Sequence, residues 1–187
     1  MNKDLKSYIL TIPNVLPADE YYEVLDYCES TNDFERREKS YDIVDTFHQK
    51  GKRFDVNLES GRIHDLVRKA FIFGLNESLN YYNHLIPKMY NMVSGYWLLK
   101  YVEGDFLTMH TDFQAEAGSI TMTYNINDNY EGGELVFWDD YVLPNQKNTI
   151  HVFPSCFLYP HEIKPIKKGD RYAAITWFGY ERGDRKI

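Results

Sequence analysis

From Val93 onward, short runs of alternating apolar and polar residues are separated by turn-forming residues, and this pattern constrains the fold more than any other feature. Such runs, rich in aromatic and β-branched side chains, predict strands. The predicted strands are 93–102, 105–111, 118–127, 133–138, 149–153, 156–163 and 171–180. Strands that follow one another through short turns predict an antiparallel jelly roll, a double-stranded β-helix built from two facing sheets.

The first half of the chain has a different pattern, which predicts supporting helices. Tyr8–Ile12 predicts a strand, and Pro17 opens a helix whose apolar residues recur at helical spacing. These apolar residues are Tyr21, Val24, Leu25 and Cys28. Ser60 is expected to cap a second helix that runs to about residue 84. The charged residues 31–53 predict a loop or weak hairpin, either a mobile lid or a solvated segment.

The length and composition suit one mainly β domain with supporting helices, of the α+β class. The chain has 187 residues, enough for one sizeable core. We expect a single domain over residues 1–187, in which residues 1–92 support a jelly-roll core at 93–180. Aromatic residues make up 16% of the chain, which is typical of a β-rich protein with an aromatic-lined interior.

Charge and targeting signals narrow the classes of partner. The net charge of −7 argues against general nucleic-acid binding, which needs a basic face. The sequence contains no apolar run of 18 residues and begins without the apolar segment of a signal peptide. Cys28 and Cys156 do not make a disulfide framework. We therefore expect a cytoplasmic protein with neither a membrane nor a nucleic acid as partner, of unknown oligomeric state.

Four polar residues in the second half of the chain are the candidate site: His110, Asp112, His161 and Arg171. His110 and Asp112 are two residues apart, so along a strand they share a face. Two imidazoles and one carboxylate can hold one face of an Fe(II) octahedron and leave the other positions open. A single His-x-Asp tripeptide is weak support, because it arises easily by chance, so the prediction depends on all four residues together.

The strands that carry His161 and Arg171 are expected to direct both side chains inward. Phe157, Tyr159 and His161 alternate along the first strand, and residues 171–180 alternate along the next. Lys167–Asp170 predicts a turn between them. The expected result is an antiparallel hairpin in which His161 and Arg171 are roughly opposite. An inward Arg is suited to binding a carboxylate through two parallel hydrogen bonds.

The remaining histidines are His48, His64, His84 and His151. We expect all four to be structural or solvated. His64 and His84 fall in the predicted helix, and His48 falls in the charged segment. His151 lies between two apolar residues of a predicted strand, so it is expected to point to the outer face, away from the site.

Six stretches of the sequence, in order, match the motifs of one enzyme family. They are Tyr101-Val102-Glu103-Gly104-Asp105, His110-Thr111-Asp112, Tyr130-Glu131-Gly132-Gly133-Glu134-Leu135, Phe153-Pro154-Ser155, His161-Glu162-Ile163-Lys164-Pro165-Ile166 and Gly169-Asp170-Arg171-Tyr172. With the N-terminal Ile12-Pro13-Asn14-Val15-Leu16, they resemble the Fe(II)/2-oxoglutarate-dependent dioxygenases of the prolyl 4-hydroxylase-like branch. The resemblance runs from about residue 8 to residue 180.

The resemblance implies a reaction and a metal site. It assigns His110, Asp112 and His161 as iron ligands and Arg171 as the partner of the far carboxylate of 2-oxoglutarate. It implies hydroxylation of a C–H bond with O₂, as 2-oxoglutarate is converted to succinate and CO₂. Fe(II) is the implied cofactor, 2-oxoglutarate the cosubstrate, and ascorbate a candidate reductant.

The resemblance also implies which residues line the cosubstrate pocket. Tyr101 matches a tyrosine that lines it, and Trp177 is expected in the wall beside Arg171. Asn125 stands where relatives often have an aromatic residue that reaches the cosubstrate. We expect Asn125, Tyr124 or a water molecule to take that role.

The sequence does not identify the substrate. The resemblance favours a proline in a peptide or protein, and a free amino acid or other small metabolite is the alternative. Trp138–Tyr141 and the basic 36–53 segment are candidates for a substrate groove. A third interpretation is a non-redox, cupin-type metal protein, which gives Arg171 no role. A fourth is a catalytically silent binding module, which does not explain why all three members of the triad His110, Asp112 and His161 are present.

Overall fold

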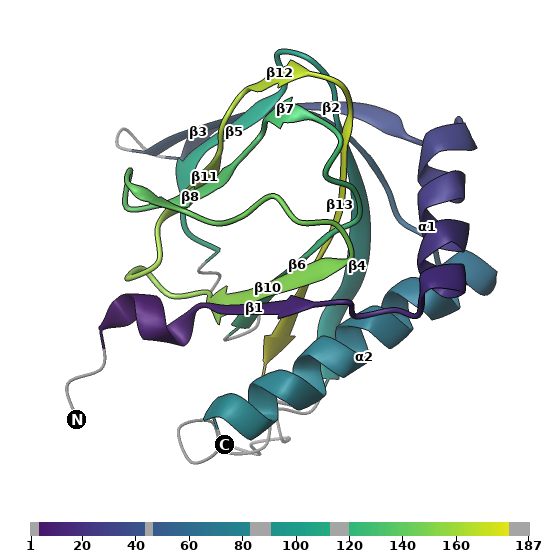
Figure 1. Cartoon of the computed structure of the whole chain (residues 1–187). Helices are drawn as coiled ribbons and strands as arrows, with labels where there is room; N and C mark the ends of the chain where they lie inside the picture. Colours follow the sequence, from purple (N-terminus) through teal and green to yellow (C-terminus); the bar gives the residue numbers. More distant parts are fainter. Residues whose placement is uncertain (1–3, 44–46, 83–90, 113–119, 180–187) are drawn as a thin grey trace, which may run out of the picture.

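The structure is a computed structural model that describes residues 4–43, 47–82, 91–112 and 120–179. These residues form a mainly β protein with two α-helices (Figure 1). The helices are α1 (Ala18–Ser30) and α2 (Arg62–Tyr82), preceded by a 3₁₀ turn at Leu5–Tyr8. The strands are β1 (Leu10–Pro13), β2 (Glu35–Ile43), β3 (Phe47–Val56), β4 (Asn91–Tyr101), β5 (Phe106–His110), β6 (Ile120–Asn125), β7 (Glu131–Gly132), β8 (Leu135–Phe137), β9 (Tyr141–Val142), β10 (Thr149–Pro154), β11 (His161–Ile163), β12 (Ile166–Lys168) and β13 (Arg171–Gly179).

One large antiparallel sheet curls around the interior, and this confirms the predicted jelly roll. Its strand order is β1-β10-β6-β13-β4-β3-β5-β11-β8-β9, with β2 paired to β3. Strand β3 joins the two halves of this sheet, because its end pairs with β4 in one half and its middle pairs with β5 in the other. The approach to β5 is close at Gly51, where an added Cβ would lie 2.7 Å from Leu107 Cδ1 and that side chain would have to shift.

Both helices pack against the outer face of one half of the sheet (Figure 1). The stripe of α2 that includes Leu66, Val67, Ala70 and Phe71 is buried there, in line with its helical spacing. Gly74 lets the helix approach closely, because a Cβ at that position would lie 3.1 Å from Ile150 Cδ1. The helices therefore form a support on the outside of the sheet and leave its inner face for the site.

A second cluster of buried side chains, which we call the inner cluster, fills the interior. It contains Leu99, Tyr101, Tyr130, Leu135, Phe137, Phe153, Tyr159 and Ile163, among others. Strand β6 separates it from the helical side and is buried on both faces. Its alternate residues Met122 and Tyr124 pack in the core beneath the helices. Thr121 and Asn125 lie on the opposite face, so the interior is unusually polar along this strand.

Most predicted elements of the first half are present, with shifted ends. Helix α1 begins immediately after Pro17, as predicted. Helix α2 begins at Arg62, and the Gly61 carbonyl accepts the first helical hydrogen bond, from the Asp65 amide. Gly61 therefore takes the N-cap position in place of Ser60.

Two predictions about the strands near His161 are wrong. Only His161–Ile163 of the predicted strand 156–163 is extended, and Phe157, expected to face inward, is 74% exposed in the preceding loop. The predicted hairpin between His161 and Arg171 is also absent. Strand β11 pairs with β5 and β8, whereas β13 pairs with β4 and β6. A jelly roll sends consecutive strands to different parts of the sheet, and β12 pairs with β7 between them.

The charged segment forms the hairpin of β2 and β3, which was one of the two structures predicted for it. Asp105 accepts a hydrogen bond from Arg36 at 2.7 Å, and Asp55 accepts one from Arg37 at 3.1 Å. The Arg36 pair attaches the hairpin to the residue before β5, and the Arg37 pair joins β2 to β3 within the hairpin. The prediction that the segment is a lid extends to residues 44–46, which lie outside the described residues.

Neither α-helix of the described residues combines the length and the apolar character needed to cross a lipid bilayer.

Both cysteines are free thiols. Cys28 is on the buried face of α1, where burial raises the pKa of its thiol to about 12, and Cys156 lies in the loop between β10 and β11. Cys28 is therefore a packing residue of the helical side.

Candidate functional site

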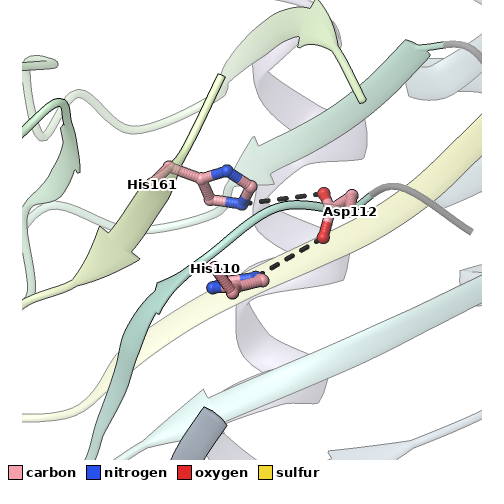
Figure 2. Close-up of side chains that lie close together, drawn as sticks. All are labelled: His110, Asp112 and His161. Carbon is pink, nitrogen blue, oxygen red and sulfur yellow. Dashed lines mark ion pairs between the residues drawn. The ribbon is translucent and has the colours of Figure 1, made fainter. Parts of the chain in front are cut away.

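The structure brings His110, Asp112 and His161 together at the ends of two paired strands (Figure 2). His110 closes β5 and His161 opens β11, and the two residues are direct partners across this strand pair. Asp112 follows His110 by two residues. Its Oδ1 lies 3.4 Å from His110 Nε2, and its Oδ2 lies 3.6 Å from His161 Nε2. One potential ligand atom from each residue fits within 4.8 Å of the others, so the group could hold a metal ion.

Backbone carbonyls orient both imidazoles toward that point. His110 Nδ1 lies 2.9 Å from the Thr108 carbonyl oxygen, and His161 Nδ1 lies 3.1 Å from the Tyr159 carbonyl oxygen. A carbonyl only accepts, so each Nδ1 carries the proton and each Nε2 keeps a free lone pair. The two free lone pairs belong to the nitrogen atoms beside Asp112.

Burial and the local charges hold Asp112 and His161 in the protonation states that metal binding needs. Burial lowers the pKa of His161 to about 4, so the imidazole is neutral at neutral pH. Burial would raise the pKa of Asp112, but His161, His110 and the Thr121 hydroxyl outweigh it and keep that pKa below its ordinary range. The Asp112 carboxylate and the neutral His161 imidazole are therefore available together as ligands.

Two hydroxyl residues hold Asp112 in place, and they were not singled out from the sequence as site residues. Thr121 Oγ1 donates to Asp112 Oδ2 at 2.7 Å. Thr121 Oγ1 is also 2.9 Å from Ser155 Oγ, and since its single proton goes to Asp112, Ser155 is the donor of that second bond. The polar face of β6 and the Phe153-Pro154-Ser155 motif were the signals that could have identified them.

Arg171 is buried in the same interior and has no negatively charged partner among the residues that the structure describes. Its side chain is 2% exposed, and its guanidinium carbon lies 5.3 Å from the centre of the Tyr101 ring, its partner across β4 and β13. Its Nη2 donates to Asn125 Oδ1 at 3.0 Å, while its Nε has no hydrogen-bond partner among the described residues. A buried cation without a counter-ion is costly, so the arrangement favours binding an anion.

Two expectations about neighbouring residues are corrected by the structure. His151 was expected on the outer face, but it is fully buried, with Nδ1 3.1 Å from Thr11 Oγ1 and Nε2 3.5 Å from Asn125 Nδ2. Tyr124 was an alternative to Asn125 near the cosubstrate, but it faces the helices and donates to Asn148. Alternation places Tyr124 and His151 on opposite faces of the sheet, and the curl of the sheet makes the face of His151 the interior.

Trp177 lies nearer the triad than was expected. It pairs in register with Thr121, the residue that binds Asp112, and it is half-buried with its indole N–H unpaired among the described residues.

Of the other histidines, His64 is half-buried and its Nδ1 lies 2.7 Å from the Leu58 carbonyl, so it is structural. His84 and the side chain of His48 lie outside the described residues.

The donor set fits Fe(II). Two imidazole nitrogens and one carboxylate on adjacent strands form a facial set, in which the rest of an octahedral shell is left for other ligands. With neutral imidazoles and one carboxylate, an Fe(II) ion there would keep one net positive charge. Both this charge and the buried Arg171 favour an anionic ligand that reaches from one to the other.

Comparisons with known proteins agree with this site. Residues 96–179 match the 2OG-Fe(II) oxygenase superfamily, and this stretch contains the triad and Arg171. A prolyl-4-hydroxylase from Pseudomonas putida has a similar structure, with a TM-score of 0.69 and 18% identity over 93% of each chain. A prolyl hydroxylase from Trichoplax adhaerens, solved with a hypoxia inducible factor peptide fragment, has a TM-score of 0.70 and 17% identity over 92% of this chain and 84% of that one.

A third similar structure is the viral collagen prolyl hydroxylase of Paramecium Bursaria Chlorella virus-1, solved as a 2OG complex. Its TM-score is 0.63 and its identity 18%, over 93% of this chain and 97% of that one. At such identities these likenesses establish the fold. The family match, together with the triad, implies Fe(II), 2-oxoglutarate and O₂, as the resemblance predicted. Over residues 96–179 the chain is similar to the 2OG-Fe(II) oxygenase superfamily, and it has the fold of the prolyl 4-hydroxylase-like structures.

Proposed function

We propose that this protein hydroxylates a prolyl side chain within a peptide, with His110, Asp112 and His161 as the iron ligands. In this proposal Arg171 binds the far carboxylate of 2-oxoglutarate, and Tyr101 and Asn125 flank Arg171. The observation that carries the site assignment is that β6 connects the triad at one end of the site with Arg171 at the other. Thr121 binds the triad and Asn125 binds Arg171, from the same face of one strand.

The spacing along β6 suits a short dicarboxylate. Thr121 and Asn125 are four residues apart, so their Cα atoms are separated by roughly 13 Å in an extended strand. The side chains of the triad and of Arg171 shorten the remaining gap. A five-carbon ligand with a chelating group at one end and a carboxylate at the other can span what is left, passing Thr123 on the way.

The bound iron and 2-oxoglutarate would supply the oxidising chemistry, in which O₂ converts 2-oxoglutarate to succinate and CO₂ and one oxygen atom enters a substrate C–H bond. The protein's own residues would bind the iron and 2-oxoglutarate, orient the ligand side chains and shield the site from water. The carbonyls of Thr108 and Tyr159 fix the imidazole planes. The rings of Phe153 and Phe137, centred 4.8 and 5.4 Å from that of His161, exclude water from one side of the triad.

Exposed apolar residues in the loop that leads to His161 support a peptide substrate. Trp138 follows Phe137, packs against Tyr159 with the two rings tilted, and donates from its indole N–H to the Leu158 carbonyl. Leu158 and Phe157 are 44% and 74% exposed on the same loop. Exposed apolar side chains on the loop that leads to a metal ligand suit a prolyl ring and its flanking residues better than they suit a small, highly charged metabolite. The peptide-bound structure of the Trichoplax relative supports the same choice.

The test is to incubate the Fe(II)-loaded protein with 2-oxoglutarate, O₂ and a panel of proline-containing peptides, and to measure peptide mass. The proposal predicts a gain of one oxygen atom on proline in at least one peptide, and no gain in the matched peptide with alanine at that position. Hydroxylation of a free amino acid, with every peptide unmodified, would overturn the peptidyl-proline proposal and favour the small-metabolite alternative.

A further inference from the structure

Polar contacts run across four neighbouring strands to Arg171. Thr11 on β1 contacts His151 on β10, His151 approaches Asn125 on β6, and Asn125 accepts from Arg171 on β13. These strands are consecutive neighbours in the sheet. The row of contacts therefore reaches from the outer edge strand to the guanidinium that the proposed function places on 2-oxoglutarate.

The direction of each hydrogen bond in the row follows from the chemistry of the groups. A guanidinium only donates, so the Asn125 oxygen faces Arg171 and the Asn125 amide nitrogen faces His151. That nitrogen lies 3.5 Å from His151 Nε2 and can only donate, so Nε2 must be unprotonated. The ring proton then resides on Nδ1, where Thr11 Oγ1 at 3.1 Å is the acceptor.

The surroundings of His151 keep it neutral, as this arrangement requires. It has no exposed surface, and burial lowers its pKa to about 4, with a smaller contribution in the same direction from the charge of Arg171. A contact with the Pro144 carbonyl opposes this shift but does not cancel it. A phenylalanine ring would occupy similar volume, so packing alone does not require an imidazole here.

We propose that His151 is a positioning residue that, through Asn125, orients Arg171 for the far carboxylate of 2-oxoglutarate. This inference rests on the proposed function. Without His151 the Asn125 amide is free to rotate, and Arg171 loses the fixed acceptor that holds one arm of its guanidinium. With that arm held by Asn125, the unpaired Nε remains available for the ligand.

The test measures ligand affinity, separately from turnover, in protein loaded with Mn(II) under anaerobic conditions. His151→Phe keeps the ring and removes the acceptor, and His151→Gln restores an acceptor and a donor. Two ligands are titrated by calorimetry: 2-oxoglutarate, and pyridine-2-carboxylate, which chelates the metal but has no far carboxylate. Mn(II) affinity is measured for each variant as the control for the triad.

We expect His151→Phe to weaken 2-oxoglutarate binding about three- to tenfold, the range of one hydrogen bond. We expect His151→Gln to recover most of that loss, with Mn(II) and pyridine-2-carboxylate binding as in the wild type. Unchanged 2-oxoglutarate binding in His151→Phe would overturn the inference. So would an equal loss for pyridine-2-carboxylate, or a His151→Gln variant as weak as His151→Phe, because each would indicate a general packing defect.

Arg171→Gln separates this inference from the proposed function on which it rests. If Arg171→Gln leaves 2-oxoglutarate affinity unchanged, the assignment of Arg171 fails and the inference fails with it. If Arg171→Gln weakens binding and His151→Phe does not, only the inference fails. Adding His151→Phe to Arg171→Gln should have no further effect, since the histidine acts through the arginine, and independent, additive losses would overturn that route.

Discussion

His161 lies directly opposite His110 across the β5–β11 strand pair, with their ring centres 4.4 Å apart. Cross-strand partners in an antiparallel pair direct their side chains to the same face, so the register alone brings two residues 51 positions apart in the sequence into one site. Asp112, two residues beyond His110, completes the group from the same end. The metal centre is thus a consequence of how these two short strands pair.

Asp112→Ala should remove metal binding. The variant loses the only carboxylate of the triad, whereas changes outside the ligand shell of metal sites typically cost 10- to 100-fold in affinity. We expect a loss greater than about a hundredfold, measured by titration with Mn(II). Glu162→Gln is the matched control, because Glu162 neighbours His161 on β11 but pairs with Lys164. A loss of similar size in both variants would contradict the assignment.

Thr121→Val should weaken metal binding without abolishing it. Valine is close in shape to threonine but cannot donate to Asp112, so the carboxylate loses the bond that holds it toward the imidazoles. We expect a 10- to 100-fold loss of Mn(II) affinity. Thr123→Val, on the same face of β6, provides the comparison and should bind Mn(II) as the wild type does. If both variants retain full affinity, Thr121 does not support the ligand.

Gly132→Ala should destabilise the fold far more than Gly104→Ala. Both glycines have positive φ, +79° and +82°, so both substitutions carry backbone strain of about 1–2 kcal/mol. A Cβ at Gly104 meets open space, whereas one at Gly132 would lie 2.3 Å from the Pro165 carbonyl oxygen. Urea unfolding should show at least about 2 kcal/mol of additional loss for Gly132→Ala. Equal losses would mean that β12 can move away from β7 at little cost.

His151 should make the metal-free protein sensitive to mild acid. Its pKa falls from about 6.5 in the unfolded chain to about 4 in the fold, so the unfolded state takes up a proton first as the pH decreases. Its contribution is fully present above pH 6.5 and is lost toward pH 4. Between pH 7.5 and 4.5 the wild type should lose roughly 2–3 kcal/mol more unfolding free energy than His151→Phe. The same loss in both proteins would contradict a neutral, buried imidazole.

Alternation and motif spacing are local properties, so the sequence could predict the architecture and indicate four candidate site residues. The inward direction of Arg171 follows from its own strand, and the structure agrees. The partners of His161 and Arg171 could not be predicted in this way, because strand pairing in a jelly roll joins residues far apart in the chain. The alternation that suggested a hairpin is the same whichever strands become neighbours.

The error at His151 has the same origin. Its apolar neighbours Ile150 and Val152 correctly indicated that it points the opposite way from them. That opposite side was taken to be solvent, whereas the curled sheet makes it the interior. Which side of a strand faces water depends on the closure of the whole sheet, and no local pattern in residues 149–154 reports it. Thr121 and Ser155 were missed similarly, because their roles appear only when β6 and β10 pair.

The most direct test of this account is succinate formation from 2-oxoglutarate by protein loaded anaerobically with Fe(II) and started with O₂, with and without the peptide panel. We predict succinate from the wild type, increased by a peptide that contains the substrate proline, and none from Asp112→Ala. Wild-type protein that binds neither Fe(II) nor 2-oxoglutarate, or equal succinate from Asp112→Ala, would contradict the account.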